Sequence, residues 1–291
     1  MSHFPWLDTT EYPFQSSYYA VNEHHLHYID EGEGSPILFV HGTPSWSFDF
    51  RQIIKQLRSD HRCIAIDHIG FGLSDKPEHY DYSTQTHSLT LEKFILNKRL
   101  DNLTLVVHDF GGPIGLQVAL RHPTLFRNII VLNSWMWNSE TDPDFIKFSK
   151  VLRNPLLPLL YKYFNFSPRF VLPQSFGEHR LPPKLLRQYT APFANSRQRN
   201  GTIAFAKSLL NDQKWFGSLW EQRHILADKA FLFLWGMKDP VIKPHYLAKF
   251  QTAFPTAQTL ELPTAGHFPQ EEQADRITIA IKKFLNGQTV V

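Results

Sequence analysis

An aspartate lies at the centre of "VVHDFGGPIG" (106–115), between an apolar run and two glycines. The valines predict a strand, and the glycines allow a sharp turn into a helix. A carboxylate on such a turn is exposed above the sheet, and the N-terminus of the next helix favours its ionised form. Asp109 is therefore predicted to attack saturated carbon and form an ester with the enzyme. An aspartate that only caps a helix gives the same local pattern, so other residues must decide.

Two further residues lie at the carboxyl ends of later strands. Asp239 follows the apolar run "AFLFLWG" within "WGMKDP", and His267 follows a second run within "TAGHFPQEE". Each is ordinary alone, since "KDP" is a good turn sequence and the chain has 15 histidines. Their order along the chain is nucleophile, acid, histidine, which is the order of an α/β-hydrolase triad. We therefore predict that Asp239 orients His267, and that His267 activates the water that hydrolyses the ester.

The segment "HGTP" (41–44) directly follows another apolar run, "PILFV" (36–40). A loop there can present the backbone N–H of Thr43 beside that of Phe110. Two such donors form an oxyanion hole for the charge that develops on the Asp109 carbonyl when water attacks. Backbone donors do not depend on the side chain, so this prediction holds for any residue type at either position.

These residues need a scaffold in which several strand ends meet. Apolar runs predict strands at 25–30, 36–40, 63–67, 103–107, 128–133, 230–236 and 257–263. Helical spacing lies between them, near 47–58, 90–100, 113–122 and 274–287. Strands that alternate with helices predict an α/β fold with a mostly parallel sheet flanked by helices. Ligands of such sheets bind beyond the carboxyl ends of the strands, where all the residues above are expected.

The middle of the chain has a different composition, rich in tryptophan and proline. Prolines interrupt it too often for continuous strands, whereas short helices remain compatible. We predict a helical insertion over 134–225, with the α/β core formed by 1–133 and 226–291.

Composition excludes several functional classes. The formal net charge is +3 without a basic stripe, so no nucleic-acid partner is expected. No apolar run approaches the ~20 residues of a membrane span, and the N-terminus lacks a signal-peptide pattern. Cys63 is the one cysteine and is expected in a buried strand, which is typical of a cytoplasmic protein. The histidines show no metal-ligand spacing, so no metal or other cofactor is expected. A monomer and a homodimer both remain open.

The chain resembles the haloalkane dehalogenases of the α/β-hydrolase fold, and more loosely the epoxide hydrolases that use an aspartate nucleophile. The resemblance covers most of the chain, in "YIDEGEGSPILFVHGTPSWSFDFR" (28–51), "IAIDHIGFGLSDKP" (64–77), "LVVHDFGGPIGLQVALRHP" (105–123), "YTAPFANSRQR" (189–199) and "AGHFPQEE" (265–272). It implies that the insertion is a helical cap over a buried apolar pocket. It also implies that water and a small apolar substrate, a haloalkane, react there to give alcohol and halide.

The chain departs from that family where halide is held. The resemblance implies tryptophan after the nucleophile and asparagine or glutamate after "HG", but Phe110 and Thr43 occupy these places. Phenylalanine has no N–H to donate. The remaining halide-binding candidates are an asparagine after the strand at 128–133 and tryptophans of the insertion, namely Asn133, Trp135, Trp137 and Trp215, with Trp220 as a further possibility.

Two other hypotheses stay open. Epoxide or strained-lactone hydrolysis could use the same triad, and epoxide opening would need acidic phenols such as those of Tyr161, Tyr163 or Tyr189 facing Asp109. A non-catalytic binding protein on a hydrolase scaffold is the third reading, against which the intact triad speaks.

Overall fold

The computed structural model describes residues 4–290, so residues 1–3 and 291 of the expected core lie outside it. Its centre is an eight-stranded sheet in the order β1-β2-β4-β3-β5-β6-β7-β8. The strands are β1 (Ser17–Val21), β2 (His24–Glu31), β3 (Pro36–Val40), β4 (Arg62–Ile66), β5 (Leu103–Asp109), β6 (Phe126–Ser134), β7 (Ala230–Gly236) and β8 (Gln258–Leu262). β1 and β2 pair antiparallel, and β2 is antiparallel to β4, while the pairs from β4 to β8 are parallel. The predicted α/β fold is confirmed.

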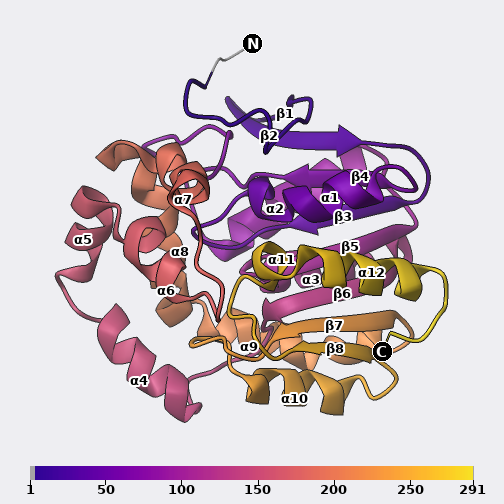
Figure 1. Ribbon diagram of the computed structural model, residues 1–291. Helices are drawn as coiled ribbons and strands as arrows, with labels where there is room; N and C mark the ends of the chain where they lie inside the picture. The colour runs from indigo at the N-terminus through magenta and orange to yellow at the C-terminus, as the bar shows by residue number, and fades with distance from the viewer. Residues whose placement is uncertain (1–3, 291) are drawn as a thin grey trace.

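Helices cover both faces of this sheet (Figure 1). The core helices are α1 (Arg51–Leu57), α2 (Thr84–Asn97), α3 (Gly111–Arg121), α10 (Pro244–Ala253), α11 (Pro269–Glu272) and α12 (Ala274–Leu285), with the 3₁₀ turns η1 (Ser47–Phe50) and η2 (Pro123–Leu125). Alternate strand residues enter different apolar clusters. Leu38 belongs to the cluster that includes residues of α2, α3 and α10, whereas Phe39 belongs to the cluster that includes residues of α1 and α12. Strands buried on both faces explain why these runs are continuously apolar.

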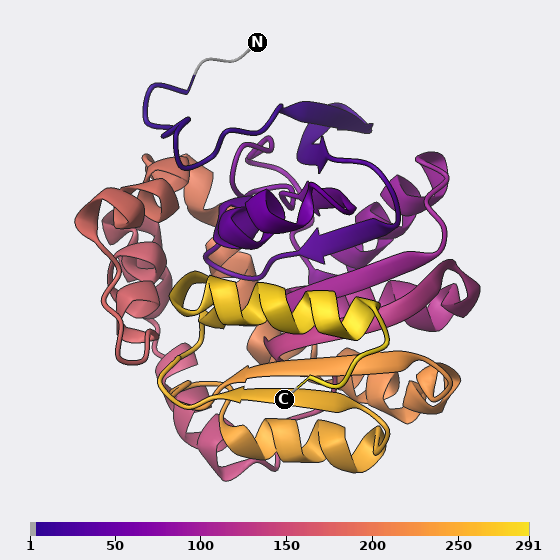
Figure 2. The same ribbon diagram turned by 45° about the vertical axis from the view of Figure 1, so that its right-hand side comes forward.

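The chain between β6 and β7 is helical. It contains α4 (Pro143–Leu152), α5 (Leu157–Phe164), the π-helical turn η3 (Ser167–Val171), α6 (Leu172–Gln174), α7 (Pro183–Thr190), η4 (Ala191–Phe193), η5 (Ser196–Arg199), α8 (Asn200–Asn211), α9 (Gln213–Glu221) and η6 (Arg223–Leu226). Figures 1 and 2 both show α4 to α8 gathered at one end of the sheet. By contrast, α9 and η6 contact α3 of the core.

Three elements differ from the sequence expectations. β1 was not expected, and its intermediate and exposed residues explain why no apolar run marks it. α2 begins at Thr84 rather than near 90, because Ser83 caps it by accepting a hydrogen bond from the Thr86 N–H. α10 was not expected either. No helix in the described part of the chain has the length and apolar character to cross a membrane.

The turn after β5 holds Asp109 in an uncommon backbone conformation. Its φ is 51°, in the left-handed region that non-glycine residues seldom occupy. Its carbonyl accepts a hydrogen bond of 2.6 Å from the Ser134 hydroxyl. The two following glycines have no room for a side chain, since a Cβ on Gly111 would lie 2.1 Å from the Val40 carbonyl oxygen. The predicted strand–turn–helix elbow is therefore present, and it directs Asp109 outward from the end of β5.

Candidate active site

The three predicted triad residues lie together at the carboxyl edge of the sheet. Asp109 ends β5, Asp239 follows β7, and His267 follows β8. The Nδ1 of His267 lies 2.7 Å from Oδ2 of Asp239, and its Nε2 lies 3.5 Å from Oδ2 of Asp109. All three side chains are nearly buried. One imidazole thus lies between two carboxylates that are far apart in the sequence.

Asp239 is fixed by donors on both of its oxygens. The Val241 and Ile242 N–H groups donate to Oδ1 at 2.7 and 2.9 Å. Burial raises its pKa, but His267 and these hydrogen bonds outweigh burial and hold the pKa below its usual value. The carboxylate is therefore ionised and can orient the imidazole.

Asn133 takes part in this support. Its amide nitrogen donates to Oδ2 of Asp239 at 2.9 Å and to the Gly236 carbonyl at 3.1 Å, and its amide oxygen accepts from the Gly236 N–H at 2.8 Å. Both amide N–H groups are thus engaged with Asp239 and Gly236, so Asn133 supports Asp239 in this structure, and its candidacy as a halide-binding residue stays a prediction.

The neighbouring carboxylates of Asp239 and Asp109 raise the pKa of His267. Burial alone lowers the pKa of a histidine, but Asp239 and Asp109 together raise that of His267 to about 10. The imidazole that lies between these two side chains is therefore protonated at neutral pH. Part of this effect comes from Asp109, so a neutral Asp109 would lower the pKa of His267.

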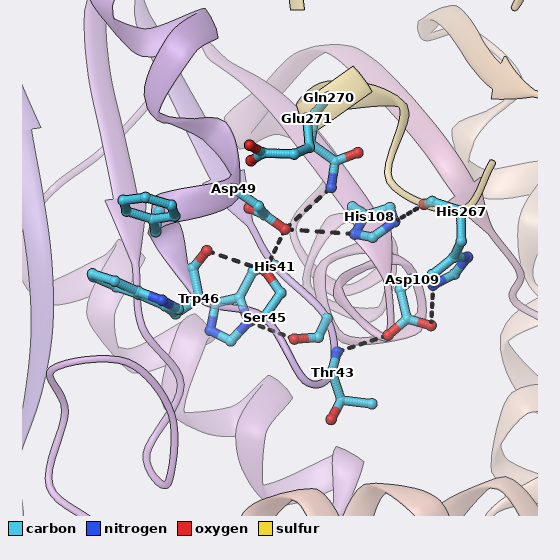
Figure 3. A network of polar contacts seen from close by, with 12 residues as sticks. His41, Thr43, Ser45, Trp46, Asp49, His108, Asp109, His267, Gln270 and Glu271 are labelled. Carbon is cyan, nitrogen blue, oxygen red and sulfur yellow. Dashed lines mark hydrogen bonds and ion pairs between the residues drawn. The ribbon is translucent and has the colours of Figure 1, made fainter. Parts of the chain in front are cut away.

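The loop after β3 approaches the Asp109 carboxylate from the other side (Figure 3). The Thr43 N–H donates to Oδ1 of Asp109 at 2.8 Å. Gly42 permits this approach, because a Cβ there would lie 2.1 Å from the same oxygen. Phe110 begins the turn into α3 beside this carboxylate, and the contribution of its N–H to an oxyanion hole stays a prediction. His41 fixes the loop, since its Nδ1 bonds to the Gly42 carbonyl and its Nε2 accepts from the His68 N–H.

A buried polar network lies behind His267 (Figure 3), which the sequence analysis did not identify. The Nε2 of His108 lies 2.7 Å from the His267 carbonyl oxygen, and its Nδ1 lies 3.8 Å from Oδ2 of Asp49. Ser45 and Gln270 donate to the same Asp49 oxygen. Burial raises the pKa of Asp49 to about 8 and lowers that of His108 to about 3. At neutral pH this network is therefore largely uncharged, and it holds the backbone of His267 in place.

An apolar cavity of about 360 Å³ opens beside Asp109. Phe145, Phe148 and Val151 of α4 form one wall, and Val241 and Ile242 form another. A smaller cavity of about 70 Å³ lies next to it and also reaches Asp109, His267 and Phe110. A carboxylate beside such walls suits a small apolar substrate, because apolar surface excludes water from the reacting groups.

The tryptophans considered as halide-binding candidates differ in whether they line a cavity beside Asp109. Trp135 lines the larger cavity and contacts the Phe110 ring edge-on at 5.0 Å between centroids. Trp137 packs among Trp220, Tyr246 and Phe250, so its ring belongs to the core. Neither cavity is lined by Trp137, Trp215 or Trp220. Trp135 is therefore the tryptophan that the structure brings to Asp109.

Hydroxyl groups also reach the smaller cavity. Tyr161 and Thr43 line it, and the Thr43 hydroxyl is buried without a hydrogen-bond partner among residues 4–290. Tyr189 lies elsewhere and donates to Glu271 at 2.7 Å, while Tyr163 is exposed on α5. Only one of the three tyrosines considered from the sequence therefore faces the Asp109 region.

Two polar contacts between α4 and the start of α10 lie at one side of the larger cavity. Asp142 accepts from Nε2 of His245 at 2.7 Å, and the Lys243 ammonium donates to Asp144 at 2.8 Å. Ligand atoms of Asp142, Asp144 and His245 lie within 4.8 Å of one another, as a metal site would require. Lys243 already neutralises Asp144, however, so the contacts present make this cluster a link between α4 and the start of α10.

Comparison with known proteins gives the class of this chain. Residues 35–274 match the family described as the alpha/beta hydrolase fold. The chain belongs to this family, and it is an enzyme of the α/β-hydrolase type.

Its relatives narrow the class further. It is 34% identical over 276 residues to haloalkane dehalogenase 2 of Mycobacterium tuberculosis, covering 94% of this chain and 96% of the relative. It is also 35% identical over 292 residues to a cis-3-alkyl-4-alkyloxetan-2-one decarboxylase of Shewanella oneidensis, covering 96% of this chain and 90% of the relative. A variant haloalkane dehalogenase of Agrobacterium tumefaciens has the same fold, with a TM-score of 0.85 at 24% identity over 98% of this chain and all of that one.

Proposed function

We propose that this enzyme hydrolyses carbon–halogen bonds of small haloalkanes through an ester on Asp109. The supporting observation is the Asp109 carboxylate itself, which lies beside an apolar cavity with one oxygen on the Thr43 N–H and the other facing His267. The helical segment 134–225 would act as the cap, since α4 and α8 supply much of the cavity wall. The 34% identity to haloalkane dehalogenase 2 of Mycobacterium tuberculosis supports this substrate class.

In the first step, Oδ2 of Asp109 attacks the carbon that bears the halogen. The new C–O bond forms as the carbon–halogen bond breaks, and the halide leaves with the bonding electron pair. Oδ1 stays on the Thr43 N–H and becomes the ester carbonyl oxygen. No proton is needed in this step, because an ionised carboxylate is already a nucleophile.

In the second step, esterification prepares His267 to act as a base. The ester carries no charge, so the contribution of Asp109 to the raised pKa of His267 disappears. His267 can then lose its proton and take one from a water that attacks Cγ of the ester. Thr43 and Phe110 would stabilise the resulting oxyanion through their N–H groups. As the tetrahedral intermediate collapses, the leaving alkoxide takes the proton of His267 and departs as the alcohol, and the proton of the remaining carboxyl returns to His267, which restores the Asp109 carboxylate. The proton that His267 lost before the attack passes to solvent, so the net products are alcohol, halide and one proton.

A strained lactone or an epoxide is the second candidate substrate, and the leaving-group side of the site favours it. Phe110 has no N–H on its ring, and the amide of Asn133 is engaged with Asp239. The leaving oxygen of a lactone departs as a carboxylate, and that of an epoxide could take a proton from the Tyr161 phenol in the smaller cavity. The 35% identity to an oxetanone decarboxylase supports the lactone branch.

Trapping the ester distinguishes these substrates. His267→Gln should block the second step, so the protein would be incubated with a bromoalkane, an epoxide and a β-lactone and its intact mass measured. A bromoalkane adds only its alkyl group, whereas an epoxide or lactone adds its whole mass. We expect the alkyl adduct, located on Asp109 by peptide mapping.

The control is His267→Gln with Asp109→Asn, which should acquire no adduct. Labelling by the lactone or epoxide alone would replace the dehalogenase proposal by the second candidate. Absence of any adduct in a folded protein would refute Asp109 as the nucleophile.

A further inference from the structure

The outer side of the helical segment exposes an unusual amount of apolar surface. Thirteen large apolar side chains are exposed in the described part of the chain, and eight of them lie between residues 146 and 170. We call these eight the apolar surface: Ile146, Val151, Leu156, Leu159, Leu160, Tyr163, Phe164 and Phe170. Leu156, Tyr163 and Phe164 are each 60 or 61% exposed. Exposed apolar residues concentrated in one short segment mark binding surfaces more often than scattered ones do.

The charged side chains within this segment are all cationic. Residues 145–177 contain five cationic side chains and no aspartate or glutamate, the cations being Lys147, Lys150, Arg153, Lys162 and Arg169. All five are exposed. Of the acids that precede the segment, Asp144 is paired with Lys243, whereas the exposed Glu140 shares a shallow hollow with Ile146, Lys150 and Arg153. A partner that complements this surface would therefore combine apolar groups with mainly negative charge.

The surface lies at the edge of the molecule. Figure 1 shows α4 and α5 at the outer side of the helical segment, with α5 the farther of the two from the sheet. The same elements reach inward to the reaction site. Val151 is 55% exposed and also lines the larger cavity, while Leu152 and Tyr161 line the smaller one. An apolar molecule held at the outer surface would thus lie close to a path toward Asp109.

We propose that the apolar surface binds an anionic lipid membrane, with α4 and α5 lying in its interfacial layer. Leucine and aromatic side chains flanked by lysine and arginine are the composition of interfacial helices. A lipid surface presents the uniform negative charge that these five cations match, whereas a protein surface usually carries both signs. The sequence predicted no membrane partner because no segment spans a bilayer, but surface binding needs no span.

Membrane binding would bring the enzyme to where apolar substrates concentrate. This consequence rests on the proposed function, while the binding itself does not. The test therefore measures binding without substrate. Because Asp109→Asn leaves the apolar surface unchanged, this variant should bind vesicles as the wild type does even if the proposed catalysis is wrong.

Flotation of the full chain with lipid vesicles tests the proposal. Vesicles of phosphatidylglycerol and phosphatidylcholine should carry the protein upward at low salt, and those of phosphatidylcholine alone should carry much less. Phe164→Glu should reduce binding at least tenfold. Ile279→Glu is the matched control, because Ile279 is 57% exposed on α12, remote from the apolar surface, and its replacement should leave binding unchanged.

A variant with fewer cations separates the contribution of charge attraction from that of apolar contact. Lys150→Gln with Arg153→Gln should weaken binding about fivefold for each cation removed. Added salt should weaken the wild type more than this variant, because charge attraction is screened.

Three outcomes would overturn the proposal. They are no binding to phosphatidylglycerol vesicles at low salt, equal binding by wild type and Phe164→Glu, and a homodimer in light scattering that Phe164→Glu dissociates. The last result would assign the apolar surface to a second copy of this chain. Thermal unfolding of each variant checks that the substitutions leave the fold intact.

Discussion

Asp109 and Phe110 are adjacent, yet they bear on different questions. The backbone of Asp109, its contact with Thr43 and its distance to His267 position the carboxylate that we propose as the nucleophile. Phe110 instead packs its ring on Phe205, with centroids 4.6 Å apart. The ring contributes apolar surface and no donor, so the identity of the leaving group depends on other side chains that face the cavity, above all Trp135 and Thr43.

Phe110→Trp should raise the rate of bromide release from a bromoalkane. An indole N–H toward a leaving halide contributes about 1.5–3 kcal/mol, or roughly 10- to 150-fold if all of it acts in the transition state. The larger ring will press on Phe205, so a loss of about 1–3 kcal/mol in the free energy of unfolding is expected as well. Halide release and chemical denaturation measure the two effects.

Phe110→Leu is the control, because it changes the packing without adding a donor. A rate for Phe110→Trp no higher than that for Phe110→Leu would mean that a donor at this position does not reach the leaving group. The dehalogenase proposal would then depend on Trp135 and Thr43 alone.

Asp49→Asn should make stability less dependent on pH. Burial raises the pKa of Asp49 to about 8 from the usual 3.8. Between these two values the folded chain binds a proton that the unfolded chain does not, so the wild type loses stability as pH rises, by about 1.4 kcal/mol per pH unit. Asparagine does not titrate and lacks this slope.

Urea denaturation of both proteins at pH 5, 6 and 7 gives the comparison. The wild type should lose stability relative to Asp49→Asn at each step, since all other titrating groups are shared. Parallel curves would show that Asp49 is ionised in the folded protein, and the network around His108 would then carry a negative charge.

At the scale of elements, α4 joins the cavity wall to the core. Asp142 caps α4 by accepting from the Asp144 and Phe145 N–H groups at 2.8 and 3.1 Å. Its other oxygen accepts from His245 of α10 at 2.7 Å. The single carboxylate therefore both begins the helix and fixes it beside α10.

Asp142→Ala should raise KM for an apolar substrate by several-fold with a smaller change in kcat. The loss of the cap costs about 1 kcal/mol, and it releases the turn that positions Phe145 in the cavity. Ser83→Ala is the matched control, because it removes the cap of α2, which lines neither cavity. Steady-state kinetics give KM and kcat for both variants. An equal change in KM for Asp142→Ala and Ser83→Ala would contradict a specific role for α4.

The sequence predicted the parallel strands well because burial on both faces makes them continuously apolar. It also predicted that Asp109, Asp239 and His267 come together, since each lies at or beyond the carboxyl end of such a strand, whereas their catalytic roles stay a prediction. The apolar pattern of a strand does not show in which direction the side chain of a residue at the strand end points. Asn133 was therefore expected at the halide, whereas its amide is engaged with Asp239 and Gly236.

The cavity wall was harder to predict for a similar reason. Phe145 and Phe148 lie on a short helix whose other side is exposed, so the pattern alone does not tell which side is covered. The neutral network of Asp49, His108 and Gln270 also escaped prediction, because its members lie far apart in sequence. His108 beside the nucleophile and Gln270 within "HFPQEE" were the available signals.

At the scale of the whole molecule, one buried cation joins distant parts of the chain. The guanidinium of Arg51 in α1 donates to Glu271 of α11 at 2.7 Å and to the Phe48 carbonyl at 3.1 Å. Tyr189 of the helical segment donates to the same Glu271 carboxylate at 2.7 Å. The side chains of Arg51 and Glu271 are 2 and 5% exposed, so neither charge is solvated by water.

Arg51→Met should lower the free energy of unfolding by about 3–5 kcal/mol, because it leaves the Glu271 carboxylate buried without its cation. Adding Glu271→Leu removes that unpaired charge and should restore about 1 kcal/mol or more, so the double variant is expected to be more stable than Arg51→Met. Arg62→Met is the control for an exposed ion pair. The side chains of Arg62 and Asp30 are 37 and 30% exposed, so the loss of this pair should lower the free energy of unfolding by at most about 1 kcal/mol. Chemical denaturation of the three variants makes the comparison. A double variant less stable than Arg51→Met would mean that the carboxylate of Glu271 stabilises the fold mainly through Tyr189, independently of Arg51.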